Sequence, residues 1–245
     1  MNLHRTLDRL RQWWRYPQPN WFQRRLLALH TDSFDTDFTA RRLASESSAR
    51  YIMEHMRTAQ NFGTDYDLHE WVATQINRPL CYNGLFLEFG VATGRTLNHW
   101  ARLFPNSTIN GFDSFEGLPE TWSWQFRQGH FHQPRPRVAD NCDLVVGWFD
   151  RTLPRFLEQH PRQCLAFLHI DCDLYSSARF VLESLADRIR PGTIIVFDEY
   201  LNFPGWEQDE HRAWCEFVER HNVKFEYLAF VSRHQQVAVR IESIG

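Results

Sequence analysis

The 245-residue chain is long enough for one α/β domain with an appendage, and its hydrophobic content of 43% allows a substantial core. A formal net charge of −3 gives no sign of a polyanion-binding surface, so nucleic acid is not an expected partner. The five cysteines form no C-x-x-C pair, and no apolar run reaches membrane-spanning length. We therefore expect a cytoplasmic protein with reduced thiols and no membrane segment.

The N-terminal stretch is rich in arginine and tryptophan. Leu3, Leu7, Leu10 and Trp14 recur at helical spacing and predict a short helix with one apolar stripe. Docking on the chain's own domain or on a second subunit is the favoured interpretation, and a membrane surface or nucleic acid is the alternative.

Two further helices are predicted before the first strand pattern, over residues 47–56 and 67–76. Asp67 and Glu70 have the spacing of a capping box at the start of the second helix. We accordingly assign residues 1–65 to a helical extension and residues 66–245 to the main domain.

Strand and helix patterns then alternate along the chain. Strands are predicted over residues 85–89, 108–112, 144–146, 165–170 and 193–197, and helices from residue 96 and over 154–159, 176–189 and about 209–221. This alternation predicts right-handed βαβ units and a mostly parallel sheet of Rossmann-like α/β class. Two closing strands, 224–231 and 236–241, are joined by only a few polar residues, which predicts an antiparallel hairpin.

The segment 122–137 is long, rich in Arg, Gln, His and aromatic residues, and lacks a clear period. Such a segment is a candidate lid or substrate loop. A disordered surface insertion is the alternative.

The central motif is a glycine turn, residues 90–94, between the strand 85–89 and the helix that follows. Gly90 and Gly94 allow close approach of the backbone to a ligand, and the helix N-terminus offers free N–H groups. The turn predicts a site for a nucleoside-bearing cofactor, with a plain strand-to-helix connection as the alternative.

Asp113 ends the next strand, about twenty residues beyond the turn, where an acid can accept hydrogen bonds from ribose hydroxyls. Both NAD and S-adenosylmethionine require such an acid. The turn lacks the G-x-G-x-x-G spacing that brings backbone to a pyrophosphate, and it follows the acid Glu88. Because the sulfonium and amino groups of S-adenosylmethionine are cationic, we expect this cofactor rather than NAD.

Four sequence blocks, in order, carry a family resemblance: 88–94 (EFGVATG), 111–119 (GFDSFEGLP), 171–175 (DCDLY) and 198–200 (DEY). Over roughly residues 80–241 the chain resembles the class I S-adenosylmethionine-dependent methyltransferases. Within them it is most similar to the macrocin O-methyltransferase family, which methylates sugar hydroxyls in antibiotic biosynthesis. The resemblance implies a sheet that ends in one antiparallel strand, and it is compatible with a homo-oligomer.

The resemblance also implies a divalent cation, usually Mg²⁺, held by Asp171, Asp198 and Glu199. Each of these acids follows an apolar predicted strand at its carboxyl end. Three converging carboxylates would repel one another unless a hard cation joined them. The alternative is that Asp198 and Glu199 only cap turns while Asp171 is solvated.

Transfer of a methyl group to a hydroxyl requires a base. In the related catechol methyltransferases, a lysine three residues after the first metal-binding Asp resembles the base. That position is Leu174 in this chain, so we expect Asp171 to act as both metal ligand and base, as the family resemblance suggests. Asp173 and His211 are lesser candidates, and His169 is expected to be a core histidine.

Three more residues are candidate cofactor contacts. Trp148 follows the third strand and is placed to stack on adenine, although packing is an equally good interpretation. Thr93 and Ser114 can hydrogen-bond the ligand or only shape their turns.

The sequence thus predicts a Mg²⁺-dependent O-methyltransferase that uses S-adenosylmethionine and acts on a small hydroxylated metabolite, such as a sugar moiety of a natural product. An NAD-linked enzyme on a similar sheet is the first alternative. A catalytically silent interaction module, recruiting a partner through the Arg/Trp-rich N-terminus, is the second.

Overall fold

The computed structural model describes residues 35–76 and 84–245. The predicted helix over residues 3–14 lies outside the described residues. The chain divides into two compact units, Met1–Leu43 and Ala44–Gly245, and the predicted boundary between residues 65 and 66 stays a prediction. No helix in the described part of the chain is long and apolar enough to cross a membrane.

The regular elements are distributed along the whole described chain. The strands are β1 (Gln60–Phe62), β2 (Leu85–Phe89), β3 (Ile109–Asp113), β4 (Cys142–Val146), β5 (Leu165–Ile170), β6 (Ile194–Phe197), β7 (Lys224–Val231) and β8 (Val237–Ser243). The helices are α3 (Thr36–His55), α4 (Asp65–Gln75), α6 (Arg95–Leu103), α7 (Phe149–Gln159), α8 (Tyr175–Leu185) and α9 (Glu210–Arg220). Short 3₁₀ turns follow at Ala186–Arg188 and Trp206–Gln208.

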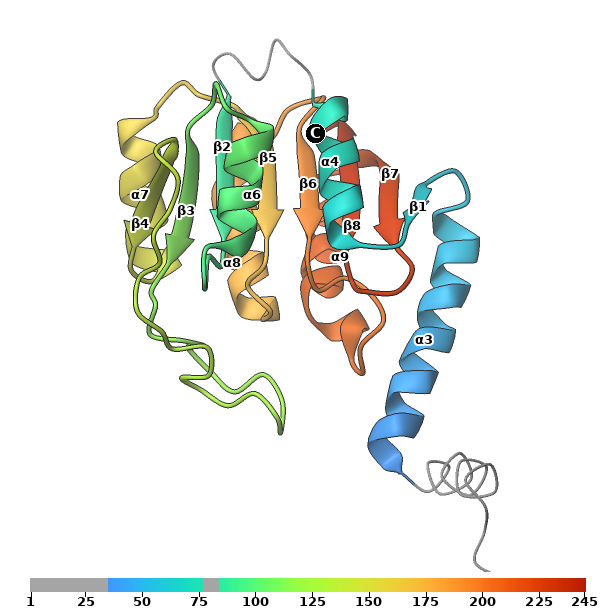
Figure 1. Cartoon of the computed structure of the whole chain (residues 1–245). Coiled ribbons are helices and arrows are strands. Elements are labelled where there is room, and N and C mark those ends of the chain that lie inside the picture. Colours follow the sequence, from blue (N-terminus) through green and yellow to red (C-terminus); the bar gives the residue numbers. More distant parts are fainter. Residues whose placement is uncertain (1–34, 77–83) are drawn as a thin grey trace, which may run out of the picture. The chain divides into compact units, whose positions relative to one another are not determined.

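The described strands form one sheet in the order β1-β7-β8-β6-β5-β2-β3-β4 (Figure 1). β8 runs antiparallel to both β6 and β7, and the other neighbours are parallel. The predicted parallel sheet with a terminal antiparallel hairpin is therefore confirmed. Because β2, β3, β5 and β6 are parallel, their carboxyl ends meet at one edge of the sheet, where a ligand site is expected.

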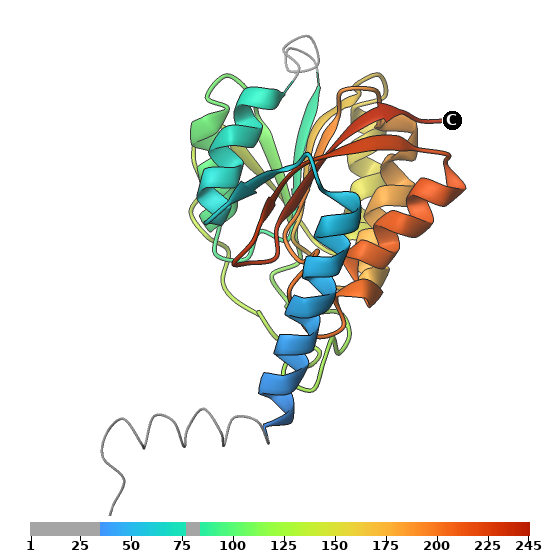
Figure 2. The same ribbon diagram turned by 90° about the vertical axis from the view of Figure 1, so that its right-hand side faces the viewer.

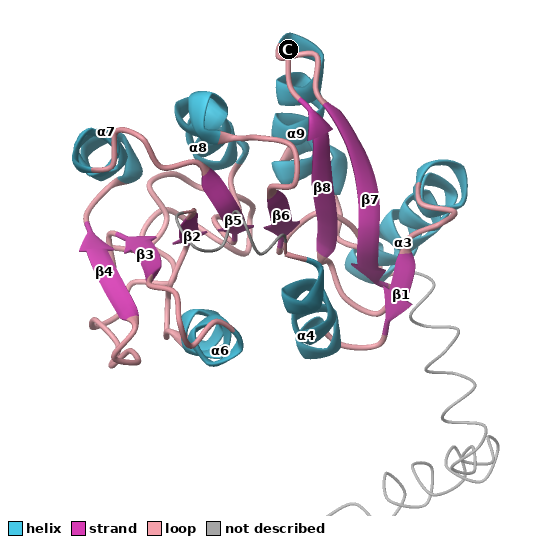
Figure 3. Cartoon of the chain, turned by 90° about the horizontal axis from the view of Figure 1, so that it is seen from above, coloured by secondary structure: helices cyan, strands magenta, loops and turns pink. Residues whose placement is uncertain are grey.

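Helices cover both faces of the sheet. Figure 3 shows α7, α8 and α9 on one face and α4 and α6 on the other, and Figure 2 shows these layers from the side. β2, β5 and β6 are buried along their whole length, which explains why their sequences are apolar except for Glu88 and His169 and do not alternate with polar residues. Two buried hydrophobic clusters result, and they hold the strand ends in fixed register.

Two local expectations were wrong. α4 begins at Asp65, and its N-cap is Thr64, whose side chain accepts a hydrogen bond from the backbone N–H of Asp67. Asp67 therefore lies inside the first turn rather than at the cap. The edge strand β1 was not predicted, because two exposed polar residues followed by one phenylalanine are too few to show a strand period.

The segment 122–137 contains no helix or strand, as its sequence indicates. It is part of the loop between β3 and β4, and backbone bonds between Leu118 and His130 fold that loop back on itself. The Trp122 indole donates to Asp209 at 2.9 Å. The structure thus gives the segment a defined path, and its function as a lid stays a prediction.

Candidate active site

A cavity of about 610 Å³ lies at the carboxyl ends of the parallel strands. It is lined by the glycine turn after β2, the ends of β3, β5 and β6, and the start of α7. Of the predicted site residues, nine line it: Gly90, Thr93, Asp113, Ser114, Trp148, Asp171, Asp173, Asp198 and Glu199. Its volume is within the range of small-molecule sites.

The glycine turn packs directly against the end of β5. Gly90 has a φ of +94°, and a Cβ built on it would lie 1.6 Å from the carbonyl oxygen of Asp171. Only glycine satisfies both conditions, since a side chain would meet backbone that cannot move aside. The turn and the first acidic strand end are therefore held in contact without space between them.

The Asp113 side chain uses most of its hydrogen-bond acceptor positions on the backbone of nearby turns. Its Oδ2 accepts from the backbone N–H groups of Val91 and Ala92 at 2.9 and 2.8 Å, and its Oδ1 accepts from Phe115 at 2.7 Å. A carboxylate offers about four acceptor positions, so about one remains for a ligand hydroxyl. Ser114 accepts from the backbone of Glu116 at 3.1 Å and so shapes the same turn.

Asp171, Asp198 and Glu199 converge as predicted. Each offers one carboxylate oxygen, and these oxygens lie within 4.8 Å of one another. Burial and the nearby Asp198 raise the pKa of Asp171 and of Glu199. The Oε2 of Glu199 is buried and has no hydrogen-bond partner among the described residues. The three carboxylates thus have too little positive charge and too few hydrogen-bond donors around them to balance their negative charge.

His169 balances part of this charge from inside the sheet. Its Nδ1 lies 3.0 Å from Glu88 Oε2, and its Nε2 lies 3.7 Å from Asp198 Oδ1. Burial disfavours its charged form, but the bonds to Asp198 and Glu88 outweigh burial and raise the pKa of His169 to about 10. Burial likewise opposes ionisation of Asp198, yet His169 and Gln236 lower the pKa of that acid to about 2.

Three predicted site residues lie outside the lining of the cavity. Glu88 is fully buried and bonds to His169 and to the Thr96 hydroxyl at 3.1 Å. Gly94 is the N-cap of α6, with a φ of +76°. His211 packs among aromatic rings, 4.9 Å from Tyr51 and 4.7 Å from Trp206 between ring centroids.

Asp173 lines the cavity beside the three converging acids. Burial and repulsion from Asp198 raise its pKa to about 7. Its backbone has a φ of +61°, a left-handed conformation that few non-glycine residues adopt.

Glu210 is a functional residue that the sequence did not reveal. This fully buried acid at the start of α9 accepts from the backbone N–H of Cys172 at 3.3 Å and of Glu199 at 3.1 Å. One side chain thus ties together the loops that carry Asp171 and Asp198. Its place at a helix start gave it no distinguishing pattern.

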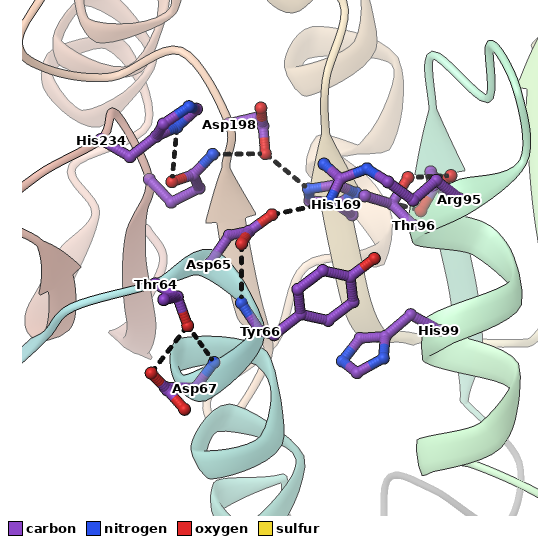
Figure 4. A network of polar contacts seen from close by, with 12 residues as sticks. Thr64, Asp65, Tyr66, Asp67, Arg95, Thr96, His99, His169, Asp198 and His234 are labelled. Atoms are coloured by element: carbon purple, nitrogen blue, oxygen red, sulfur yellow. Dashed lines mark hydrogen bonds and ion pairs between the residues drawn. The ribbon is translucent and has the colours of Figure 1, made fainter.

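Two arginines, also not predicted, line the cavity: Arg95 and Arg151. Arg95 donates to Asp65 at 2.8 Å, as Figure 4 shows, and its guanidinium lies 5.3 Å from the centre of the Tyr66 ring. These contacts hold a positive group beside the glycine turn. No spacing rule distinguishes such an arginine from the many others in the chain.

Comparison with known proteins agrees with this geometry. Residues 87–200 match a family described as a methyltransferase domain. A rhamnosyl-tetracenomycin C 4'-O-methyltransferase of Streptomyces olivaceus is 32% identical over a match that covers 36% of this chain and 40% of that protein. The chain thus spans less than half the length of this curated relative.

Two solved structures share the fold. CalS11, a calicheamicin methyltransferase, has a TM-score of 0.58 and 25% identity, covering 72% of this chain and 78% of that one. The O-methyltransferase NovP has a TM-score of 0.54 and 18% identity, covering 72% of this chain and 79% of that one.

The strand order and the likeness to CalS11 show a Rossmann-like methyltransferase fold, and residues 87–200 match a methyltransferase domain. The class I resemblance predicted from the sequence is confirmed. Its named relatives are O-methyltransferases of natural products.

Proposed function

We propose that the chain is an S-adenosylmethionine-dependent O-methyltransferase that requires a divalent cation and methylates a hydroxyl of a small, sugar-bearing metabolite. The observation that carries the proposal is the single cavity in which the glycine turn meets the ends of β5 and β6. The names of the similar proteins, which modify rhamnosyl tetracenomycin and calicheamicin, support the choice of acceptor.

The cofactor would lie along the glycine turn. The remaining acceptor position of Asp113 suits a ribose hydroxyl, and Trp148 offers a ring at the start of α7 for adenine. Arg95 and Arg151 suit the carboxylate of the methionyl group. Gly90 and Thr93 form the wall closest to the acids of β5 and β6.

The acidic group fits a hard cation such as Mg²⁺. Its donors are all oxygens, three of them converge, and the buried Glu199 Oε2 lacks a partner. Asp171, Asp198 and Glu199 would hold the ion. When bound, such a cation lowers the pKa of an acceptor hydroxyl and so favours its deprotonation.

Asp171 is the residue that we assign as base. Asp171 lines the cavity directly beside the glycine turn, so its carboxylate lies in the space that the cofactor and the acceptor hydroxyl would share. With the methyl donor bound, the carboxylate would take the hydroxyl proton while the acceptor oxygen bonds to the methyl carbon. The carbon–sulfur bond would break with its electron pair left on sulfur, so that S-adenosylhomocysteine would remain.

The cavity offers further groups to the acceptor. Asp173 can accept a hydrogen bond from a second hydroxyl, and Phe131 presents an aromatic ring at the cavity wall. Phe126 stacks on Phe131 with ring centroids 5.5 Å apart, and Trp122 stacks on Phe126 at 5.2 Å. A stacked ring is a suitable support for the apolar face of a sugar.

Thermal denaturation with candidate cofactors tests the assignment. S-adenosylhomocysteine should raise the midpoint of unfolding because it binds only the folded chain, whereas NADH should not. Protection by NADH alone would support the alternative enzyme class. No protection by either compound would favour the silent interaction module.

The cation requirement is tested separately, by methyl transfer from labelled S-adenosylmethionine with and without chelator. Activity should fall in chelator and return with added Mg²⁺. Undiminished turnover after complete chelation would exclude the role of the metal and leave cofactor binding intact.

A further inference from the structure

We propose that His69, His169 and Asp198 form a second, buried metal site that binds a divalent transition-metal ion, with Zn²⁺ as the best fit. The three residues come from α4, β5 and the end of β6. Each offers one ligand atom, and these atoms lie within 4.8 Å of one another. All three side chains are buried, and the two histidines, unlike Asp198, do not line the cavity.

Unpartnered nitrogen atoms point to a missing ligand. Both ring nitrogens of His69 are buried without a hydrogen-bond partner among the described residues, and the Nε2 of His169 has no hydrogen bond there beyond its ion pair with Asp198 at 3.7 Å. Each such atom costs on the order of 1–3 kcal/mol when nothing replaces water. The rings nearest to His69 offer it no acceptor, since Trp100 lies against it with centroids 4.2 Å apart.

The outer contacts of the group have the pattern of a metal site. Metal-bound histidines commonly donate their other ring N–H to a carboxylate. Here Glu88 Oε2 lies 3.0 Å from Nδ1 of His169, and Gln236 donates to Asp198 Oδ1 at 2.9 Å. Glu88 is itself held by Thr96. The Nε2 of His169 is thereby directed toward Asp198.

The spacing requires little adjustment for an ion to enter. Nε2 of His169 and Oδ1 of Asp198 are 3.7 Å apart. Two ligands of a tetrahedral zinc ion, each about 2.0–2.1 Å from the metal, are separated by about 3.4 Å. A shift of a few tenths of an ångström would therefore complete this pair.

The donor set selects a different ion from the acidic group. Two imidazole nitrogens and one carboxylate suit zinc and its transition-metal neighbours, whereas Mg²⁺ prefers oxygen ligands throughout. Glu88 and Asp198 supply negative charge that a bound cation would balance. The ion would take the place of the proton on Nε2 of His169, which is released to water.

The consequence would be a fixed position for Asp198. One oxygen of this side chain would face the zinc ion while the carboxylate still reaches Asp171 and Glu199. The ion would also tie α4 to the interior of the sheet. Since neither His69 nor His169 lines the cavity, an acceptor there would not reach the ion, and the role of the ion would be structural rather than catalytic.

Zinc uptake by the tag-free full chain tests this proposal. Wild-type protein is equilibrated with Zn²⁺, passed through gel filtration and analysed for metal by mass spectrometry. We expect stoichiometric zinc in the wild type and a loss of zinc in His69→Gln. Glu88→Gln should weaken zinc affinity by about 10–100-fold, because Glu88 orients the ligand His169.

Two variants serve as controls. His99→Asn removes a neighbouring histidine, 5.6 Å from His69 between ring centroids, that is not part of the group. Asp171→Asn disables the acidic group but leaves the three proposed ligands. Both variants should retain stoichiometric zinc.

Two results would overturn the proposal: a wild-type chain that takes up no zinc, or a His69→Gln variant that takes up as much as the wild type. Circular dichroism establishes that each variant is folded. If His69→Gln fails to fold, the Glu88→Gln variant decides, and unchanged zinc affinity in it contradicts the site. Cofactor binding, measured separately, keeps this outcome distinct from the proposed enzymatic function.

Discussion

Asp198 belongs to two groups of side chains with opposite physical character. Toward the cavity it joins Asp171 and Glu199, where the donors are all oxygen and a ligand can enter. Toward the interior it faces His69 and His169, which are fully buried, and both ring nitrogens of His69 have no hydrogen-bond partner among the described residues. Under the two proposals, this single strand end would serve both the reaction and the architecture that holds the site.

The three acids Asp171, Asp198 and Glu199 are called the open group below. The largest effect is expected from Asp171→Asn, which acts only on this group. Activity should fall by about 10²–10⁴-fold because the proton acceptor is lost, while cofactor affinity changes little. Turnover and S-adenosylhomocysteine titration measure the two quantities. The exposed Asp143→Asn is a charge-matched control. Equal losses of activity and of cofactor affinity would argue against a base at Asp171.

A second prediction tests the contact between the glycine turn and the open group. Gly90→Ala should destabilise the fold by about 3 kcal/mol or more, because its Cβ would overlap the backbone of Asp171 and its φ of +94° is strained. Gly129→Ala is the matched control. Gly129 has a φ of +79° with nothing within 4 Å, so only strain of about 1 kcal/mol is expected. Urea unfolding measures both, and similar losses would show that the close approach is unimportant.

A third prediction concerns Glu210, the buried side chain that links the two loops carrying the open group and is called the tether here. Glu210→Gln should cost about 1–3 kcal/mol, because an amide has one acceptor oxygen for the two backbone N–H groups that Glu210 receives. Activity should fall with it, since Asp171 and Asp198 lose a common support. The exposed Glu207→Gln should leave both unchanged. A fully stable and active Glu210→Gln would contradict the tether.

The smallest effect is expected from a half-buried histidine outside both groups. Burial lowers the pKa of His211 from 6.5 to about 4, so the folded state resists its protonation. Stability from this side chain is present above pH 6.5 and is lost as the pH falls toward 4, by an amount on the order of 1 kcal/mol because solvent screens a half-buried group.

His211→Gln should therefore reduce the loss of stability between neutral and acidic pH. Chemical denaturation of the wild type and the variant at several pH values measures the difference. Parallel pH profiles would show that His211 does not contribute to acid sensitivity.

The sequence predicted the open group well, and the reason is local. Asp171 and Asp198 directly follow apolar strands that are buried on both faces, so strand pattern and chain order together place their carboxylates at one edge. The parallel sheet and its closing hairpin followed from the same patterns. Family resemblance then connected these acids to a cofactor.

The buried group of His69, His169 and Asp198 could not be predicted in this way. His69 lies within α4, and His169 was expected to be an ordinary core histidine, because a single buried histidine carries no spacing signal. Glu88 was predicted to face the cofactor, yet side-chain packing turns it toward His169 and Thr96. Such contacts depend on how α4, α6 and β5 pack, which no local pattern records.

Diffraction from crystals grown with S-adenosylhomocysteine and Mn²⁺, a substitute for Mg²⁺ with an anomalous signal, tests the central claim most directly. The account predicts cofactor density along the glycine turn beside Asp113 and a manganese peak among Asp171, Asp198 and Glu199. Cofactor bound away from this cavity, or manganese absent from these three carboxylates, would contradict it.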